Sequence, residues 1–237
     1  MKIGLFSDPH FSSQVLTCGK RYNSRSLEKI QRAMRAFEAA HCDLAICLGD
    51  VTDTEEDHEA EKHNVAKISA VLSEAKIPTR CVMGNHDAFT FAPEEFYAIL
   101  DRQTKPEPIF TKEYSLLFLD ACYFSDGTHY APGDDNWMDT FYPQVDALEA
   151  ELAKAPGDIY VFMHQNLDPN IHVSHRLSND SQVRRTLEAC GRVRHVFQGH
   201  YHDGAESIVN GIRYTTLPAM CENEDAYRIF EIENKTK

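Results

Sequence analysis

The chain has 237 residues, of which 42% are hydrophobic and 26% are charged, and its formal net charge is −13. This composition is that of an ordinary globular protein and excludes wholesale disorder. The acidic balance, without any Lys/Arg-rich block, excludes a nucleic-acid polymer as the ligand. No run approaches the roughly 20 apolar residues of a membrane span, so neither a membrane segment nor a membrane partner is expected.

The N-terminal run Met1–Phe6 is too short for a signal peptide and leads directly into polar residues. The seven cysteines are odd in number and include no CxxC pair, which favours thiols over a disulfide framework. We therefore expect a cytoplasmic protein. No repeat, low-complexity linker or shift in composition divides the chain, so residues 1–237 are expected to form a single domain.

Short apolar runs alternate with segments of helical periodicity. The expected strands are Lys2–Phe6, Leu44–Leu48, Thr79–Met83, Tyr114–Leu119, Ile159–Met163 and Val193–Phe197. Several are continuously apolar, as in parallel strands that are buried on both faces. Helical spacing of apolar residues is found within 27–37, 65–72, 145–152 and 180–190. The alternation predicts an α/β fold with a largely parallel core.

The last third of the chain has a different pattern. Asn210-Gly211, a strong hairpin signal, separates the runs Glu206–Val209 and Ile212–Leu217. A final alternating strand, Tyr227–Ile232, follows. This pattern predicts a second sheet with antiparallel pairing, packed face to face with the first.

Five short polar motifs follow predicted strands. They are Asp8-Pro9-His10, Gly49-Asp50-Val51-Thr52-Asp53, Gly84-Asn85-His86-Asp87, the single His164, and Gly199-His200-Tyr201-His202. In open α/β sheets, ligands bind outside the carboxyl ends of the strands, so these motifs are expected to converge. Each one alone also fits a turn, a helix cap or a satisfied histidine. Their joint occurrence at the same end of successive strands favours a shared site.

The residue types of these motifs suit metal binding. Carboxylate oxygen and imidazole nitrogen bind Mn²⁺, Fe and Zn²⁺, and one Asp can bridge two cations. Two cations about 3.5 to 4 Å apart can hold a bridging hydroxide and clamp an in-line displacement at phosphorus. They would also return positive charge to an acidic chain, which allows it to bind a small phosphate.

The order of the five motifs, from residue 8 to residue 202, resembles that of the calcineurin-like metallophosphoesterase superfamily. The resemblance implies a four-layer α-β-β-α sandwich, in which two mixed β-sheets with flanking helices hold two divalent or mixed-valence metal ions (Mn, Fe or Zn) at one edge. It also implies the ligands: one metal is bound by Asp8, His10 and His202, the other by Asn85, His164 and His200, and both by Asp50. His86 would be the general acid or transition-state stabiliser, with Asp87 orienting its ring.

Two finer similarities point to a branch of this superfamily. Gly-Asp-x-x-Asp without a following Arg resembles the class III cyclic nucleotide phosphodiesterases, and the run from His175 to Tyr227 is similar to Mn²⁺-dependent ADP-ribose/CDP-alcohol diphosphatases. The resemblance implies hydrolysis of a small phosphate ester, a phosphodiester or nucleotide-type diphosphate, by attack of a metal-bridging hydroxide. A phosphomonoesterase, a different metal enzyme such as an amidohydrolase, and a non-catalytic metal-binding scaffold remain as alternatives.

Three further segments have open roles. Tyr22, Asn23 and Arg25 either meet a phosphate or nucleobase or belong to a solvated loop. Asn166 and the polar segment Asp168–Asn179 are expected to line the substrate entrance. The segment Asp126–Thr140, which contains the only tryptophan, is long enough to be a lid or a homodimer contact.

Overall fold

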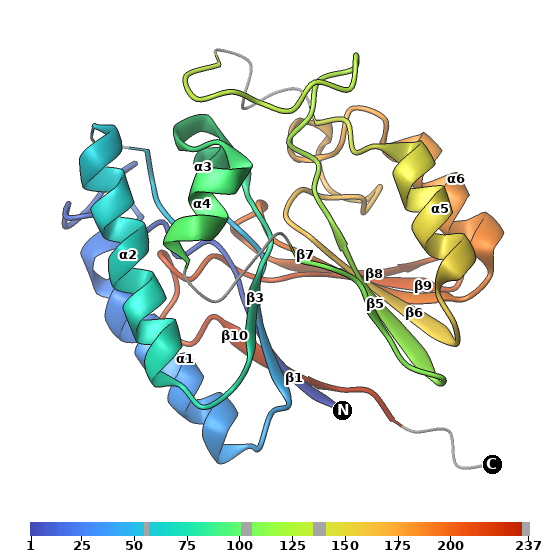
Figure 1. Cartoon of the computed structure of the whole chain (residues 1–237), viewed down its shortest axis with the longest axis horizontal. Coiled ribbons are helices and arrows are strands. Elements are labelled where there is room, and N and C mark those ends of the chain that lie inside the picture. The colour runs from blue at the N-terminus through green and yellow to red at the C-terminus, as the bar shows by residue number, and fades with distance from the viewer. Residues whose placement is uncertain (55–56, 101–105, 135–140, 234–237) are drawn as a thin grey trace.

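Two β-sheets face each other and carry helices on their outer faces in this computed structural model, which describes residues 1–54, 57–100, 106–134 and 141–233 (Figure 1). The first sheet contains β1 (Lys2–Phe6), β2 (Leu44–Cys47), β3 (Thr79–Cys81) and β10 (Tyr227–Glu231). The second contains β4 (Ile109–Phe110), β5 (Tyr114–Leu119), β6 (Asp158–Met163), β7 (Val193–Gln198), β8 (Ala205–Val209) and β9 (Ile212–Thr216).

The helices complete the outer layers. On the side of the first sheet lie α1 (Ser26–Ala39), α2 (His58–Glu74), α3 (Asn85–Thr90) and α4 (Pro93–Ile99), and on the other side lie α5 (Val145–Lys154) and α6 (Asp180–Cys190) (Figure 1). Two short 3₁₀ helices are η1 (Asn23–Arg25) and η2 (Val173–His175). The predicted α/β class and four-layer sandwich are therefore confirmed. Among the described residues, no helix has both the length and the apolar character needed to cross a membrane.

Both sheets are mixed. In the first, β1, β2 and β3 are parallel and β10 is antiparallel to β1. In the second, β5, β6, β7 and β9 are parallel, while β4 and β8 pair antiparallel at the edges. The expectation that the C-terminal strands build a sheet of their own is wrong. The hairpin β8–β9 extends the second sheet and β10 joins the first, because apolar patterning reports burial of a strand but not its pairing partner.

Apolar side chains from both sheets fill the space between them. Leu5 and Ile46 of the first sheet belong to the same buried cluster as Phe162 and Phe197 of the second. The rings of Phe162 and Phe197 stack with their centroids 5.2 Å apart. This interior fixes the two sheets face to face, so their carboxyl ends form one shared edge.

One histidine is buried in this interior. His195 of β7 is 6% exposed, and its ring stacks on Phe197 with centroids 3.8 Å apart. Its Nε2 lies 2.8 Å from Thr215 Oγ1. Burial lowers the pKa of His195 from 6.5 to about 3, so the folded chain holds this ring neutral.

His195 is therefore expected to contribute to acid unfolding. Its folded pKa lies below its unfolded value, so its contribution to stability is present above pH 6.5 and is lost as the pH falls towards 3. Denaturant titrations give the free energy of unfolding of the metal-free wild type and of His195→Gln at each pH. The difference between the two should change by up to about 1.4 kcal/mol per pH unit in this window. The exposed His63→Gln is the control, and a pH-independent difference for His195→Gln would contradict the assignment.

The segment Asp126–Thr140 is described only as far as residue 134, so Trp137 and the rest of this expected lid or dimer contact lie outside the described residues. Of the seven cysteines, all of them in the described ranges, none forms a disulfide. Cys18 is exposed and Cys221 is buried.

Candidate metal centre

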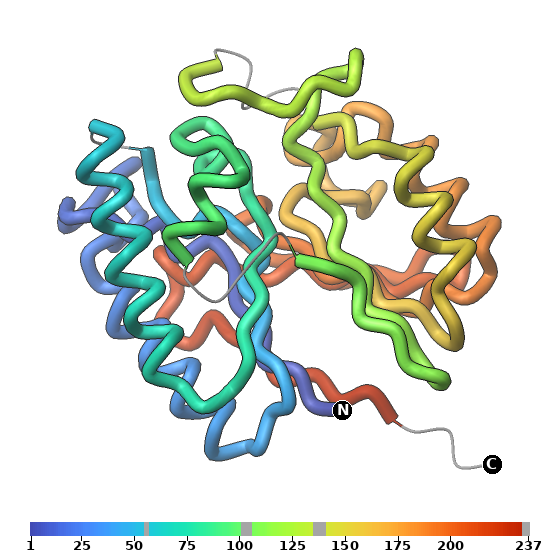
Figure 2. Tube along the Cα trace, in the orientation of Figure 1, coloured from blue at the N-terminus to red at the C-terminus, as the bar shows by residue number. Residues whose placement is uncertain are grey.

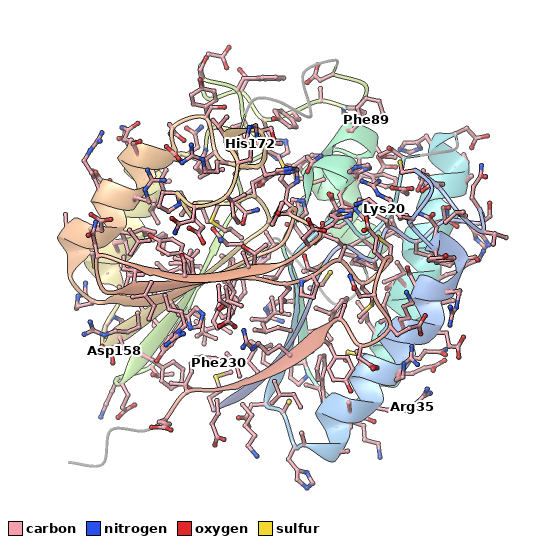
Figure 3. The ribbon with its side chains drawn as sticks, turned by 180° about the vertical axis from the view of Figure 1, so that it is seen from behind. Lys20, Arg35, Phe89, Asp158, His172 and Phe230 are labelled. Atoms are coloured by element: carbon pink, nitrogen blue, oxygen red, sulfur yellow. The ribbon has the colours of Figure 1, made fainter. Side chains whose placement is uncertain are left out.

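The predicted ligands meet where the two sheets present their carboxyl ends. The loops that follow β1, β2, β3, β6 and β7 lie together on the side of the trace opposite the N-terminus (Figure 2). A cavity of about 350 Å³ opens there. It is lined by Cys18, Lys20, Arg21, Asp50, Asn85, His86, Ser174, His175, His200, Tyr201, His202 and Asp203. Seen from behind, Lys20 and His172 lie on this side, away from Arg35 and Asp158 (Figure 3).

The first ligand set joins motifs from both ends of the chain. His10 Nε2 lies 3.2 Å from His202 Nε2 and 3.5 Å from Asp50 Oδ2. Asp8 Oδ1 lies 3.8 Å from His10 Nε2 and 3.5 Å from His202 Nε2. Ligand atoms bound to one cation at 2.0–2.2 Å are separated by about 3 to 3.5 Å, so the spacing suits a single metal ion.

The outer nitrogens of these two histidines face carboxylates. His10 Nδ1 lies 2.9 Å from Asp53 Oδ1, and His202 Nδ1 lies 2.5 Å from Glu222 Oε1. A hydrogen on Nδ1 of each ring, directed at these carboxylates, would leave a lone pair on each Nε2. Two such lone pairs 3.2 Å apart would repel each other without a cation beside both, so this tautomer suits metal binding.

The second ligand set surrounds the end of β6. His164 Nε2 lies 3.1 Å from Asp50 Oδ2, and donor atoms of Asp50, His164 and His200 all lie within 4.8 Å of one another. The Nδ1–H of His164 donates to Leu48 O over 2.7 Å, which again directs Nε2 into the site. Asn85 lines the same cavity as Asp50 and His200.

Two orphaned atoms show that this set fits a cation. Asn85 Oδ1 and His164 Nε2 are buried and have no hydrogen-bond partner. A buried acceptor without a partner is unfavourable by about 1 to 3 kcal/mol, and a bound cation removes that penalty. Asp50 Oδ2 belongs to both sets, which is the position expected of a bridging ligand.

Strained backbone marks the same residues. Eight non-glycine residues in the described ranges have a positive φ, and half of them are predicted ligands. These are Asp8 (51°), His10 (41°), Asp50 (51°) and His200 (65°). Left-handed backbone is uncommon for residues with a Cβ, and it persists where the surroundings over-determine it, as at functional sites.

Two glycines allow the motifs to approach one another. A Cβ on Gly84 would overlap the carboxylate and backbone nitrogen of Asp50, and one on Gly199 would overlap Ser7 Oγ and Asp8 Oδ2. The backbone of the third motif therefore lies directly against the bridging aspartate. The fifth motif approaches the first in the same way, and His200 N–H donates to the Asp8 carboxylate over 3.1 Å.

The charges of the site are set by burial and by each other. Burial alone would raise the pKa of Asp8 and of Asp50, but His164 and the other nearby histidines together outweigh it, and both pKa values fall below their usual range. Burial opposes charge on His164, but Asp50 raises its pKa to about 10. Burial and the neighbouring His164 lower the pKa of His200 to about 3.

The contacts of Asp87 correct one expectation. Its Oδ1 accepts hydrogen bonds from the backbone N–H of Val51 (2.8 Å) and Thr52 (3.3 Å), and its Oδ2 accepts one from Gly84 N–H (2.9 Å). Burial and the charge of Asp50 raise its pKa to about 8. Asp87 thus joins the second motif to the third rather than orienting the His86 ring. Its side chain turns back onto the start of α3, where a first-turn carboxylate meets unpaired amides.

The atoms at His86 Nδ1 come from the end of the second motif. They are Thr54 Oγ1 at 3.2 Å and Asp53 O at 3.3 Å. The Thr54 hydroxyl itself donates to Asp53 O over 2.5 Å, so the Nδ1 of His86 carries the hydrogen of this contact.

Asp53 ends the second motif, and its carboxylate contacts four side chains around the first ligand set. Besides His10, its carboxylate receives hydrogen bonds from Thr17 Oγ1 (2.7 Å), Arg21 Nη1 (2.6 Å) and Asn23 Nδ2 (2.8 Å). The loop after the first motif is therefore tied to a metal ligand. Asn23, for which a substrate contact and a solvated loop were both open, is buried in this network, whereas Arg21, which was given no role, lines the cavity.

A sequence model of the calcineurin-like phosphoesterase family matches residues 1–204 of the chain. The match covers most of the chain and all five motifs. The chain belongs to the calcineurin-like phosphoesterases. Membership implies a metal-dependent phosphoesterase with two cations, and the two ligand sets that share Asp50 are the candidates to hold them.

Relatives of this phosphoesterase have been found in bacteria. It is 25% identical over 221 residues to a probable cyclic nucleotide phosphodiesterase of Fibrobacter succinogenes, with 85% of this chain and 73% of that protein aligned. It is 23% identical over 227 residues to a probable cyclic nucleotide phosphodiesterase of Psychrobacter arcticus, with 91% and 74% aligned.

Solved structures share the fold of this phosphoesterase. A dimetal phosphatase from Danio rerio superposes with a TM-score of 0.80 at 16% identity and covers 97% of this chain and 91% of that one. A Thermus thermophilus protein superposes with a TM-score of 0.58 at 14% identity, over 93% and 90%.

Proposed function

We propose that this phosphoesterase hydrolyses a phosphodiester in the cavity beside Asp50, with two divalent or mixed-valence cations drawn from Mn, Fe and Zn. The observation that carries the proposal is Asp50 Oδ2, which lies 3.5 Å from His10 Nε2 and 3.1 Å from His164 Nε2 and so serves both ligand sets. The names of both bacterial relatives, probable cyclic nucleotide phosphodiesterases, support a diester over a monoester.

When bound, the cations would neutralise negative charge on the phosphoryl oxygens and would generate a nucleophile from water. The chain itself supplies the acid. His86 lines the cavity with Nδ1 held by Asp53 O and Thr54 Oγ1, and from its imidazolium form it would give the Nε2 proton to the leaving oxygen. This role also explains why a histidine directly follows the ligand Asn85.

Two cationic side chains supply attraction for an anion. Arg21 is held by Asp53 at 2.6 Å, and Lys20, with its side chain 60% exposed, lies 3.1 Å from Glu222 Oε2. Both line the cavity of a chain whose net charge is −13. Their positive charge favours a nucleotide-type diphosphate, which carries more negative charge than a diester, as the second candidate substrate.

The substrate class is tested with paired chromogenic phosphate diesters and monoesters in the presence of Mn²⁺. The wild type is expected to prefer the diester, and Asp50→Asn is expected to be inactive on both. A preference for the monoester would support a phosphomonoesterase instead. Two bound cations without hydrolysis of either ester or of a nucleotide diphosphate would favour a scaffold, and hydrolysis of only an amide or lactone would favour a different metal enzyme.

Replacement of His86 by Ala should leave both cations bound but lower kcat by about 10²- to 10⁴-fold, the usual contribution of a positioned acid. The loss should be larger for an alkyl diester than for a nitrophenyl diester, because a poor leaving group needs the proton more. The measurement is kcat for both esters, together with the metal content of the same samples. Equal losses for the two leaving groups would show that His86 does not protonate the leaving oxygen.

A further inference from the structure

A cysteine lies against the first ligand set. Cys221 follows β9 and is fully buried, and its sulfur lies within 4.8 Å of donor nitrogens of both His10 and His202. We propose that Cys221 Sγ is a further donor to the cation held by these histidines. That cation site would then combine nitrogen, oxygen and sulfur ligands and would select Zn²⁺, Co²⁺ or Fe²⁺ over Mn²⁺.

The backbone around the cysteine is fixed on both sides. Cys221 N–H donates to Asp8 O over 3.1 Å, and Cys221 O accepts from Tyr22 N–H over 2.9 Å. The Nζ of Lys29, a side chain that is 2% exposed, donates to Met220 O (2.8 Å) and to Cys221 O (3.3 Å). A donor that is held in place before the cation arrives needs little reorganisation on binding.

The next residue is tied to the same site. Glu222 Oε1 lies 2.5 Å from Nδ1 of His202, one of the histidines that face the thiol. Cys221 itself is held by the hydrogen bond from its backbone N–H to Asp8 O, and the next residue, Glu222, is held by its side-chain contact with His202. A shift of this segment would move the sulfur and both contacts together.

The surroundings of Cys221 differ from those of a cysteine that only fills an apolar space. Buried cysteines often act as small hydrophobes, and Cys47 belongs to the large apolar cluster. Cys221 is buried as well, but its sulfur lies within 4.8 Å of the donor nitrogens of His10 and His202. The sulfur thus shares the environment of the ligands.

Sulfur changes which metals such a site prefers. Thiolate ligands favour Zn²⁺ and other soft or borderline ions, whereas Mn²⁺ favours carboxylate, carbonyl and water oxygen. Coordination would replace the S–H bond of Cys221 by a sulfur–metal bond, and the proton would leave to solvent. The other ligand set contains only oxygen and nitrogen donors in the described residues, so the two positions would differ in metal preference.

X-ray absorption of the zinc-loaded full chain tests the inference directly. With two equivalents of Zn²⁺ bound to the wild type, a sulfur shell at about 2.3 Å is expected beside the nitrogen and oxygen shell at about 2.0 to 2.1 Å. This measurement needs no variant. Only nitrogen and oxygen shells in the fully loaded wild type would overturn the proposal.

Cobalt substitution assigns the sulfur to one residue. The Co²⁺-loaded wild type should show a near-ultraviolet sulfur-to-metal charge-transfer band. It should persist in Cys18→Ser, which removes the exposed cysteine of the same cavity, and it should disappear in Cys221→Ser and Cys221→Ala. A band that persists in both Cys221 variants, or that is lost in Cys18→Ser, would contradict the assignment.

Metal competition gives the functional consequence. Cys221→Ser should weaken Zn²⁺ binding at one of the two positions by about 10- to 100-fold, the range found when support of a metal ligand is lost, with a much smaller change for Mn²⁺. Equal weakening for both metals would contradict the role of sulfur.

The inference rests on the two-cation site of the proposed function. An inactive protein with the sulfur shell would reject that function alone, and an active protein without it would reject this inference alone.

Discussion

Asp50→Asn is expected to remove both cations and to lower hydrolysis on the order of 10³-fold or more, the scale on which the loss of preorganised charge stabilisation acts. Asp50 Oδ1 accepts a hydrogen bond from His86 N–H over 2.9 Å. An amide side chain would keep its oxygen in that bond and place its NH₂ where Oδ2 now faces His10 Nε2 and His164 Nε2. An NH₂ group is only a donor and cannot bind a cation.

Metal analysis after gel filtration, together with hydrolysis rates, measures this effect. Asp53→Asn is the matched control, because Asp53 contacts the first ligand set through His10 Nδ1 and lies outside the second. It should weaken one cation by about 10- to 100-fold and leave the other in place. If Asp50→Asn retained two equivalents of metal, Asp50 would not be the bridging ligand.

The meeting of distant motifs could be predicted from the sequence for a simple reason. Asp8, Asp50 and His164 each follow a short buried strand, and parallel strands present their carboxyl ends on one side. That argument holds even though the strands divide between two sheets, since the apolar layer between them keeps both edges together. Pairing within each sheet was not predictable, because a continuous apolar run looks the same in either.

The support of the ligands was not predictable. Glu222 lies 20 residues beyond His202, and acidic residues are too common for one of them to be singled out. The role of Asp87 was also hidden, because its partners are backbone amides exposed only by the turn of the second motif. The positive φ of His10 could not be predicted either, because glycine is the residue that usually indicates a left-handed backbone in a sequence.

Asn166 is another such support, and its burial corrects the expectation that it lines the substrate entrance, whereas Ser174 and His175 of the following segment do line the cavity. Asn166 is fully buried, and its Nδ2 donates to Gly199 O over 2.8 Å, directly before the ligand His200. Its Oδ1 accepts hydrogen bonds from Thr216 Oγ1 (2.7 Å) and Gln198 Nε2 (3.2 Å). Asn166 also lies two residues after His164, so it sets the spacing between two ligands of the second cation.

Asn166→Asp should therefore weaken one cation and the fold together. The new carboxylate keeps an acceptor for Thr216 and Gln198, but it loses the donor to Gly199 O and buries a charge against that carbonyl. We expect a loss of about 2 to 4 kcal/mol in the free energy of unfolding. The affinity for the cation at His164 and His200 should fall by about 10- to 100-fold. Denaturant titration and calorimetric metal binding measure the two effects.

Leu152→Ala separates these two effects. Leu152 is buried on α5, outside both ligand sets, and its truncation should lower stability by a similar 2 to 5 kcal/mol, roughly the range for a buried leucine. If the metal loss in Asn166→Asp followed only from lower stability, Leu152→Ala would show it as well. Loss of one cation in Asn166→Asp but in neither position of Leu152→Ala would establish that the amide holds His164 and His200 at the spacing that the second cation requires.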